Sequence, residues 1–233
     1  MRKSSWIPPL LILCLGVLAG CATTHPVAYQ GLASSAQLSP NPQRGGHVTF
    51  LYLADNVDSP SYNSVILEPV ANYDGPDHQF GDTSQAEKKL LVEYAQTQFT
   101  EVLKSQYAVV AAPGRNTLRV RVTLTGIETN TPGLAPIMKI FPLGLLINTV
   151  DTVQDRQGPL SGSVSFAVEI YDSASNRLLR AYVSKEYPAA ENIGASFGAL
   201  DASKAGIRKG AHSLLKQLRP TTQESSTVVS AAE

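Results

Sequence analysis

Two stretches of the chain alternate between apolar and polar side chains, and this pattern constrains the fold most. In Thr117–Ile127 leucine and valine alternate with arginine and threonine, and Gly162–Asp172 repeats the pattern. Successive side chains of a strand point to opposite faces, so each stretch predicts a strand with one buried face. Half-buried strands of this kind are typical of antiparallel sheets. We expect Leu179, Ala181 and Val183 to continue the buried face on the return strand.

Two other stretches have the 3.6-residue period of an amphipathic helix. The first helix is predicted from about Ser84 to Ser105, because Ser84 and Glu87 have the spacing of a capping box. The second is predicted from about Ser196 to Leu218, with Ser196 as its N-cap. Small residues recur every four positions in the second helix and indicate close packing on the sheet: Ala202, Gly206 and Gly210.

Shorter apolar runs predict three more strands, at residues 48–53, 64–70 and 107–111. The first helix should then cross over between parallel strands, while the remaining strands are antiparallel. We therefore predict an α+β fold, with a mixed, mostly antiparallel sheet and two amphipathic helices packed on one face. The shared core is predicted to include Phe99, Val120, Phe166 and Leu214.

The start of the chain has the composition of a secretory signal. Arg2 and Lys3 precede an uncharged apolar stretch, Trp6–Val17, that is too short to span a membrane. The stretch ends in Leu18-Ala19-Gly20-Cys21, which resembles the lipobox of bacterial lipoproteins. That resemblance implies cleavage before Cys21, a diacylglycerol thioether on its sulfur and acylation of the new amino terminus. The alternative is a plain secretory signal with an incidental cysteine.

Three acyl chains would anchor the protein stably, since even two lipid signals suffice for lasting membrane attachment. In Gram-negative lipoproteins an aspartate after the lipidated cysteine usually retains the protein in the inner membrane. Ala22 stands there in this chain. The resemblance thus implies an outer-membrane protein that faces the periplasm.

The chain divides into four regions: residues 1–20 as signal peptide, 21–46 as lipidated tether, 47–219 as a single periplasmic domain and 220–233 as a disordered tail. The region after Cys21 is rich in Ala, Ser, Pro, Gln and Gly, so as a flexible coil it would reach about 27 Å. Tyr29–Leu32 and Leu38 are the residues of the tether that could dock onto the domain. We expect tether and tail to be dispensable for folding.

Composition argues against several classes of function. The formal net charge is zero, so the chain lacks the basic excess of a nucleic-acid-binding protein. Its cysteines are Cys14, in the signal, and Cys21, so the mature chain should hold no disulfide. The four histidines share no metal-ligand spacing, and neither a metal nor another cofactor is predicted.

One string has the form of a catalytic motif. Gly194–Gly198 reads G-x-S-x-G, which in hydrolases places the serine on a strand-to-helix elbow. The later acid and histidine, Asp201 and His212, fall on one predicted helix. A cell-envelope hydrolase that uses Ser196 is therefore the alternative to a protein without enzymatic activity.

Two groups of residues are candidates for an interaction surface. Arg119, Arg121, Glu169 and Arg180 should form charge pairs on the outer face of the sheet, where they are either ordinary solvated surface or part of a partner site. Residues 133–150 hold one charge in eighteen positions. They form either additional core over the sheet or an apolar patch for a partner or the membrane surface. The patch would comprise Ile137, Ile140, Phe141, Leu145 and Leu146.

Seven short stretches, taken together and in this order, resemble domain-of-unknown-function family 3313, a family of bacterial lipoproteins. They are Tyr29–Leu32, Leu38–Pro40, Tyr62–Val70, Tyr107–Gly114, Leu118–Thr125, Pro142–Gly144 and Glu169–Ser173. The family has no established activity, so the resemblance implies only a fold and a cellular location. We expect an outer-membrane lipoprotein that serves as a binding or structural module, with an envelope protein or a second copy of itself as partner.

Overall fold

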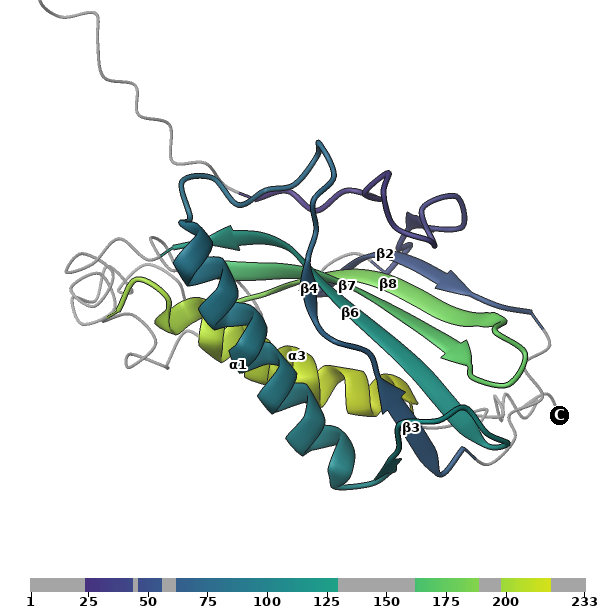
Figure 1. Ribbon diagram of the computed structural model, residues 1–233. Coiled ribbons are helices and arrows are strands. Elements are labelled where there is room, and N and C mark those ends of the chain that lie inside the picture. The colour runs from purple at the N-terminus through teal and green to yellow at the C-terminus, as the bar shows by residue number, and fades with distance from the viewer. Residues whose placement is uncertain (1–23, 44–45, 56–61, 130–161, 189–197, 219–233) are drawn as a thin grey trace, which may run out of the picture.

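The computed structural model describes residues 24–43, 46–55, 62–129, 162–188 and 198–218. In these ranges the chain forms one sheet and two helices (Figure 1). The elements are β1 (Ser39–Pro40), β2 (Val48–Leu53), β3 (Ser64–Leu67), β4 (Ala71–Asn72), α1 (Gln85–Lys104), β5 (Ala108–Val109), β6 (Thr117–Glu128), β7 (Ser163–Asp172), β8 (Leu178–Glu186) and α3 (Asp201–Leu218).

The sheet is mixed, and its long strands are antiparallel. The strand order is β1-β2-β8-β7-β6-β3-β5, and β4 pairs with β6 beside β3. The pairs β1–β2, β2–β8, β8–β7 and β7–β6 are antiparallel, whereas β3 is parallel to both β5 and β6. Helix α1 thus connects parallel strands, and both helices lie on the same side of the sheet (Figure 1). The predicted α+β class is confirmed.

The two helices begin differently from one another. Helix α1 starts as predicted, because the Ser84 hydroxyl accepts from the Glu87 amide while the Ser84 amide donates to the Glu87 carboxylate. The predicted start of the second helix is wrong, since α3 begins at Asp201. There the Asp201 carboxylate accepts a hydrogen bond from the Gly198 amide at 2.8 Å. Ser196 is therefore not the N-cap of α3, and it lies outside the described residues.

The main core fills the space between the helices and the sheet. Phe99, Val120, Phe166 and Leu214 all belong to it, as the alternation of the strands predicts. The rings of Phe99 and Phe166 meet edge to face, with centroids 5.8 Å apart. Edge-to-face pairs add stabilisation beyond the burial of apolar area.

Small residues let α3 approach the sheet closely. A Cβ on Gly206 would lie 2.8 Å from the carbonyl oxygen of Glu186, and a Cβ on Gly210 would lie 2.2 Å from Cζ of Phe166. Both distances are shorter than a van der Waals contact. The predicted role of these glycines in packing the helix on the sheet is confirmed.

The prediction for the return strand is wrong in part. Leu179 packs in the main core, but Ala181 and Val183 belong to a second apolar cluster on the opposite face of the sheet. The cause is a register shift between β7 and β8, where Arg180 lies opposite Ile170 but Leu178 lies opposite Tyr171. Leu179 is the extra residue at this β-bulge. The residues of β8 that follow it therefore point to the faces opposite to those predicted by simple alternation.

The domain boundary is also wrong, because part of the predicted tether belongs to the domain. Tyr29, Leu32 and Leu38 are buried in the second apolar cluster, and β1 pairs with β2. We refer to residues 24–43 as the N-terminal segment. A buried segment cannot act as a free tether, and we expect its removal to destabilise the domain.

Several predictions concern residues outside the described ranges. These are the signal peptide with Cys21, the apolar patch at Ile137, Ile140, Phe141, Leu145 and Leu146, and the tail at 220–233.

The contact between α3 and β7 can be tested with two substitutions. Phe166→Ala should cost about 3–5 kcal/mol of folding free energy, because a fully buried ring is lost. Gly210→Ala should also destabilise, because its Cβ would collide with that ring, although alanine favours a helix by about 1 kcal/mol. Urea unfolding of both variants measures these losses.

The double variant provides the control. The cavity left by Phe166→Ala has room for the new methyl group, so Gly210→Ala should stabilise the protein in that background. Losses that simply add would show that the two residues do not touch in solution.

Candidate functional site

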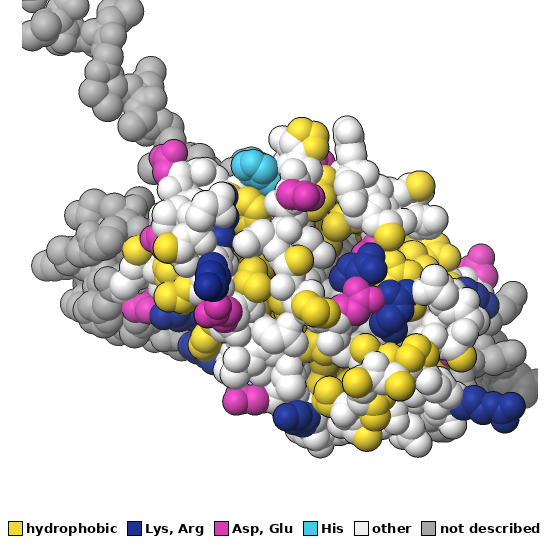
Figure 2. Space-filling view, viewed as in Figure 1, with side chains coloured by type: hydrophobic (Ala, Val, Ile, Leu, Met, Phe, Trp, Pro, Cys, Tyr) yellow, Lys and Arg dark blue, Asp and Glu magenta, His cyan; other side chains and the backbone are white. Residues whose placement is uncertain are grey.

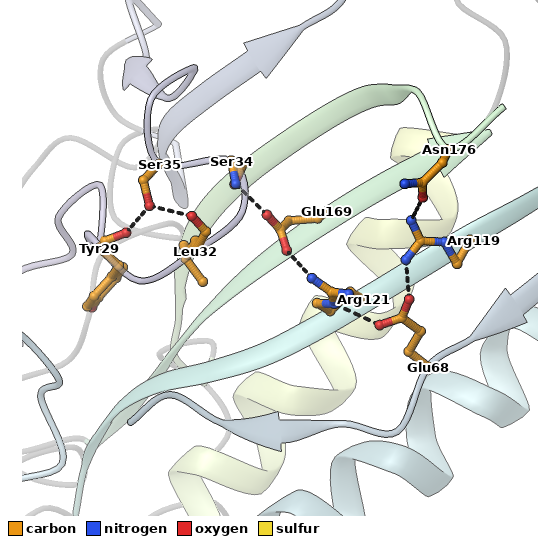
Figure 3. A network of polar contacts seen from close by, with 9 residues as sticks. All are labelled: Tyr29, Leu32, Ser34, Ser35, Glu68, Arg119, Arg121, Glu169 and Asn176. Carbon is orange, nitrogen blue, oxygen red and sulfur yellow. Dashed lines mark hydrogen bonds and ion pairs between the residues drawn. The ribbon is translucent and has the colours of Figure 1, made fainter. Parts of the chain in front are cut away.

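A polar network crosses the face of the sheet that is turned away from the helices (Figure 3). Glu68, just after β3, accepts hydrogen bonds from Arg119 and Arg121 on β6. Arg119 also donates to Asn176 in the β7–β8 turn, and its guanidinium lies 4.2 Å from the centroid of the Tyr171 ring. The network therefore ties together the two parallel strands and the hairpin of β7 and β8.

The shared carboxylate is electrostatically coupled to its two arginines. Burial alone would raise the pKa of Glu68, but the hydrogen bonds from Arg121 and Arg119 outweigh it and lower the pKa below its ordinary value. In turn, the hydrogen bond to Glu68 raises the pKa of Arg121. Glu68 is thus ionised at neutral pH and holds both guanidinium groups in place.

The network continues into the interior through Glu169 on β7. This side chain is 2% exposed, and its carboxylate lies 3.6 Å from the guanidinium of Arg121. Its other oxygen accepts a hydrogen bond of 2.7 Å from the amide of Ser34. A buried carboxylate needs such partners, because the cost of removing a charge from water is several kcal/mol. The N-terminal segment therefore satisfies a charge on the central strand.

The Tyr29–Leu32 motif docks on a tyrosine of the loop after β4. The rings of Tyr29 and Tyr73 meet edge to face at 5.2 Å, and the amide of Gly31 donates to the Tyr73 hydroxyl. That hydroxyl donates to Asp77, which also accepts from the amide of Gln30. A Cβ on Gly31 would lie 3.0 Å from the Tyr73 ring, so glycine permits the close approach.

A second polar cluster holds the beginning of the N-terminal segment. Lys185 on β8 donates to the carbonyl oxygen of Thr24 at 2.8 Å and lies 3.1 Å from the carboxylate of Glu128. The hydroxyls of Thr24 and Ser163 are 3.4 Å apart, and Ser163 donates to Glu128. Thr24 is thereby fixed at the end of the sheet where β6 ends and β7 begins.

The predicted charge pairs are confirmed for Arg119, Arg121 and Glu169, but not for Arg180. The bulge in β8 turns Arg180 toward the helices, where it donates to the carbonyl oxygen of Gln217 at 2.6 Å. Sequence reasoning missed Glu68 as the partner of both arginines. Its position after a short parallel strand brings it beside β6, and no local pattern indicates that placement.

These contacts describe a site that binds its own chain. Each charged side chain of the network faces an opposite charge or a backbone group, and the buried end of the network is closed by the N-terminal segment. On the face shown in Figure 2, acidic and basic side chains are interspersed. The arrangement can hold the segment in register on the sheet.

The acid and the histidine of the candidate triad do not come together. Asp201 and His212 lie eleven residues apart on α3, which corresponds to about 16 Å along a helix. The Asp201 carboxylate accepts a hydrogen bond from the Gly198 amide, which precedes the helix, and the His212 side chain is exposed. Ser196 lies outside the described ranges. Among the described residues, no three His, Cys, Asp or Glu side chains are grouped so as to hold a metal ion.

Comparison with known proteins bears on the whole domain. A family model described as protein of unknown function, DUF3313, matches residues 28–214. The uncharacterized lipoprotein YdcL of Escherichia coli strain K12 is 23% identical over 183 residues, which cover 76% of this chain and 80% of the relative. No helix in the described part of the chain is long and apolar enough to cross a membrane.

Solved structures show weaker likeness. The PelC dodecamer from Paraburkholderia phytofirmans matches with a TM-score of 0.37 and 12% identity, over 68% of this chain and 92% of that one. Protein XCC0632 from Xanthomonas campestris matches with a TM-score of 0.34 and 8% identity, over 70% and 88% of the two chains. Likeness at this level carries no argument about function.

The docking of the N-terminal segment predicts a cost for truncating its main anchor. Tyr29→Ala should destabilise the protein by about 3 kcal/mol or more, because Tyr29 is 1% exposed in the second cluster. The melting temperature should then fall by about 6–12 °C, as measured by calorimetry. Val27→Ala, two residues earlier and exposed, is the matched control. Equal melting temperatures for both variants would mean that the segment does not dock.

The coupling of Glu68 to its arginines predicts a pH dependence. A carboxyl whose pKa is lowered by folding stabilises the folded state above its ordinary value of 4.5, and this contribution is lost as the pH falls through the folded pKa. The melting temperature of Glu68→Gln should therefore fall less steeply than that of the wild type between about pH 6 and about pH 3. Glu101→Gln, on the exposed side of α1, controls for the loss of one negative charge. Parallel curves for wild type and Glu68→Gln would refute the coupling.

Proposed function

Because this chain belongs to the DUF3313 family, which its match over residues 28–214 shows, we propose that it is an outer-membrane lipoprotein anchored through Cys21. Its domain faces the periplasm and serves as a binding or structural module of the cell envelope. The observation that carries the proposal is the string Leu18-Ala19-Gly20-Cys21, followed by Ala22. The relative in Escherichia coli is named a lipoprotein, which supports the lipid anchor.

The role as a module is supported by how the polar side chains of the domain are used. Glu68, Arg121 and Glu169 pair with one another and with the backbone of Ser34, so they hold the fold together. Asp201, the first acid after Ser196 in the sequence, accepts a hydrogen bond from the Gly198 amide at the start of α3. This arrangement favours a protein that acts through its surface and its location over a hydrolase that uses Ser196.

Cell fractionation with metabolic labelling tests the anchor and the address separately. The wild type should incorporate labelled palmitate and sediment with the outer membrane. Cys21→Ala should lose the label and leave the membrane fraction, because the acylated residue is gone. Ala22→Asp should keep the label but move to the inner membrane, while Ala22→Ser serves as the matched control for a change at that position.

The same cells allow the role as a module to be tested. Crosslinking in intact cells should capture an envelope protein or a second copy of the chain, and the crosslinked species should be lost in Cys21→Ala. A variant without Cys21 that still sediments with membranes and still labels with palmitate would overturn the proposal.

A further inference from the structure

The point at which the N-terminal segment is fixed determines how the domain can sit on a membrane. Thr24 is buried, and its carbonyl oxygen and hydroxyl are held by Lys185 and Ser163. The next residue, His25, exchanges two hydrogen bonds of 2.6 Å with the side chain of Gln79. The backbone of Gln79 in turn pairs with β6 around Gly126. Two independent sets of contacts therefore fix the chain here.

Only two residues, Ala22 and Thr23, lie between this fixed point and Cys21. A fully extended chain spans at most about 3.6 Å per residue, so the Cα atoms of Cys21 and Thr24 lie within about 11 Å of each other. A free tether to residue 46 would reach about 27 Å. The chain between Cys21 and the first fixed residue of the domain is therefore much shorter than the predicted tether.

The distance that the chain between Cys21 and Thr24 can span is also short compared with the length of the domain. Strand β6 has twelve residues and, at about 3.3 Å per residue, spans about 36 Å between its first and last Cα atoms. Thr24 lies beside Glu128 and Ser163, at the end of the sheet opposite the β7–β8 turn. Figure 1 shows the described chain beginning near the end of β6, far from that turn. An anchor within about 11 Å of one end cannot bring the other end to the bilayer without turning the domain over.

We propose that the end of the domain formed by Thr24, Glu128, Ser163 and Lys185 rests against the phospholipid surface, and that the β7–β8 turn points away from it. The inference rests on the lipidation of Cys21 proposed above. It assigns the lipid surface as the partner of one end of the sheet and leaves the opposite end, with Asn176 and the start of β6, for contacts in the periplasm.

Fluorescence quenching in vesicles tests this orientation. The mature chain has Cys21 as its single cysteine, and lipid occupies its sulfur, so one added cysteine can carry a dye. Thr129→Cys places the dye at the proposed membrane end and Ala174→Cys places it in the β7–β8 turn, and both positions are exposed. The purified lipidated proteins are reconstituted into vesicles of phosphatidylethanolamine and phosphatidylglycerol that carry a nitroxide quencher on a fraction of the headgroups. The dye at position 129 should be quenched several-fold more strongly than the dye at position 174.

A variant with a longer linker between Cys21 and Thr24 is the matched control. A flexible insertion of about 25 residues between Ala22 and Thr23 would extend the reach by about 27 Å, and the difference between the two dyes should then shrink. In the protein without the insertion, equal quenching of both dyes, or stronger quenching at position 174, would overturn the orientation while leaving the lipid anchor intact. Failure of the proteins to bind vesicles at all would overturn the lipidation and this inference with it.

Discussion

The fold depends on a central strand, β7, that is buried on both faces. From Ser163 to Tyr171 each side chain is shielded from solvent, and its neighbours β6 and β8 pair with it along its length. A strand in this position needs a cover on each side of the sheet. The two helices supply one cover, through Phe99 and the close approach of α3, and the N-terminal segment supplies the other.

The second cover explains the polar network. Glu169 points to the face that the N-terminal segment covers, so its carboxylate is removed from water and must be paired. Arg121 and the Ser34 amide pair with the Glu169 carboxylate. Glu68 in turn forms ion pairs with Arg121 and with the neighbouring Arg119. Hydrogen bonds to a buried charge are directional, so they also set the register of the segment on the sheet. Apolar burial at Tyr29 and this polar pairing act on the same short piece of chain.

The packing of the segment also links the fold to the proposed location of the protein. A chain that is fixed at Thr24 leaves little slack before Cys21, so an anchor there would hold the domain close to the bilayer. Surfaces at the far end of the sheet would then be presented at a height set by the strand length of β6. Stability, attachment and presentation would thus depend on the same contacts.

The sequence by itself determined the secondary structure and the main core, because these follow from local periodicity. Alternation identified β6 and β7 and the inward position of Phe166, the Ser84–Glu87 spacing identified the start of α1, and the glycines of α3 indicated close packing. The string Leu18-Ala19-Gly20-Cys21, which resembles a lipobox, is local too. Each of these signals lies within a few residues of the feature that it predicts.

Only the tertiary structure decided what covers the second face of the sheet. The N-terminal segment has no apolar period, and its few anchors make sense only beside Tyr73, Glu169 and β2, which are distant in sequence. The bulge that turns Ala181 and Arg180 to unexpected faces depends on the register with β7. The pairing of Glu68 with two arginines requires parallel strands to be adjacent. These features arise from contacts between segments far apart in the chain, and periodicity within one segment carries no information about them.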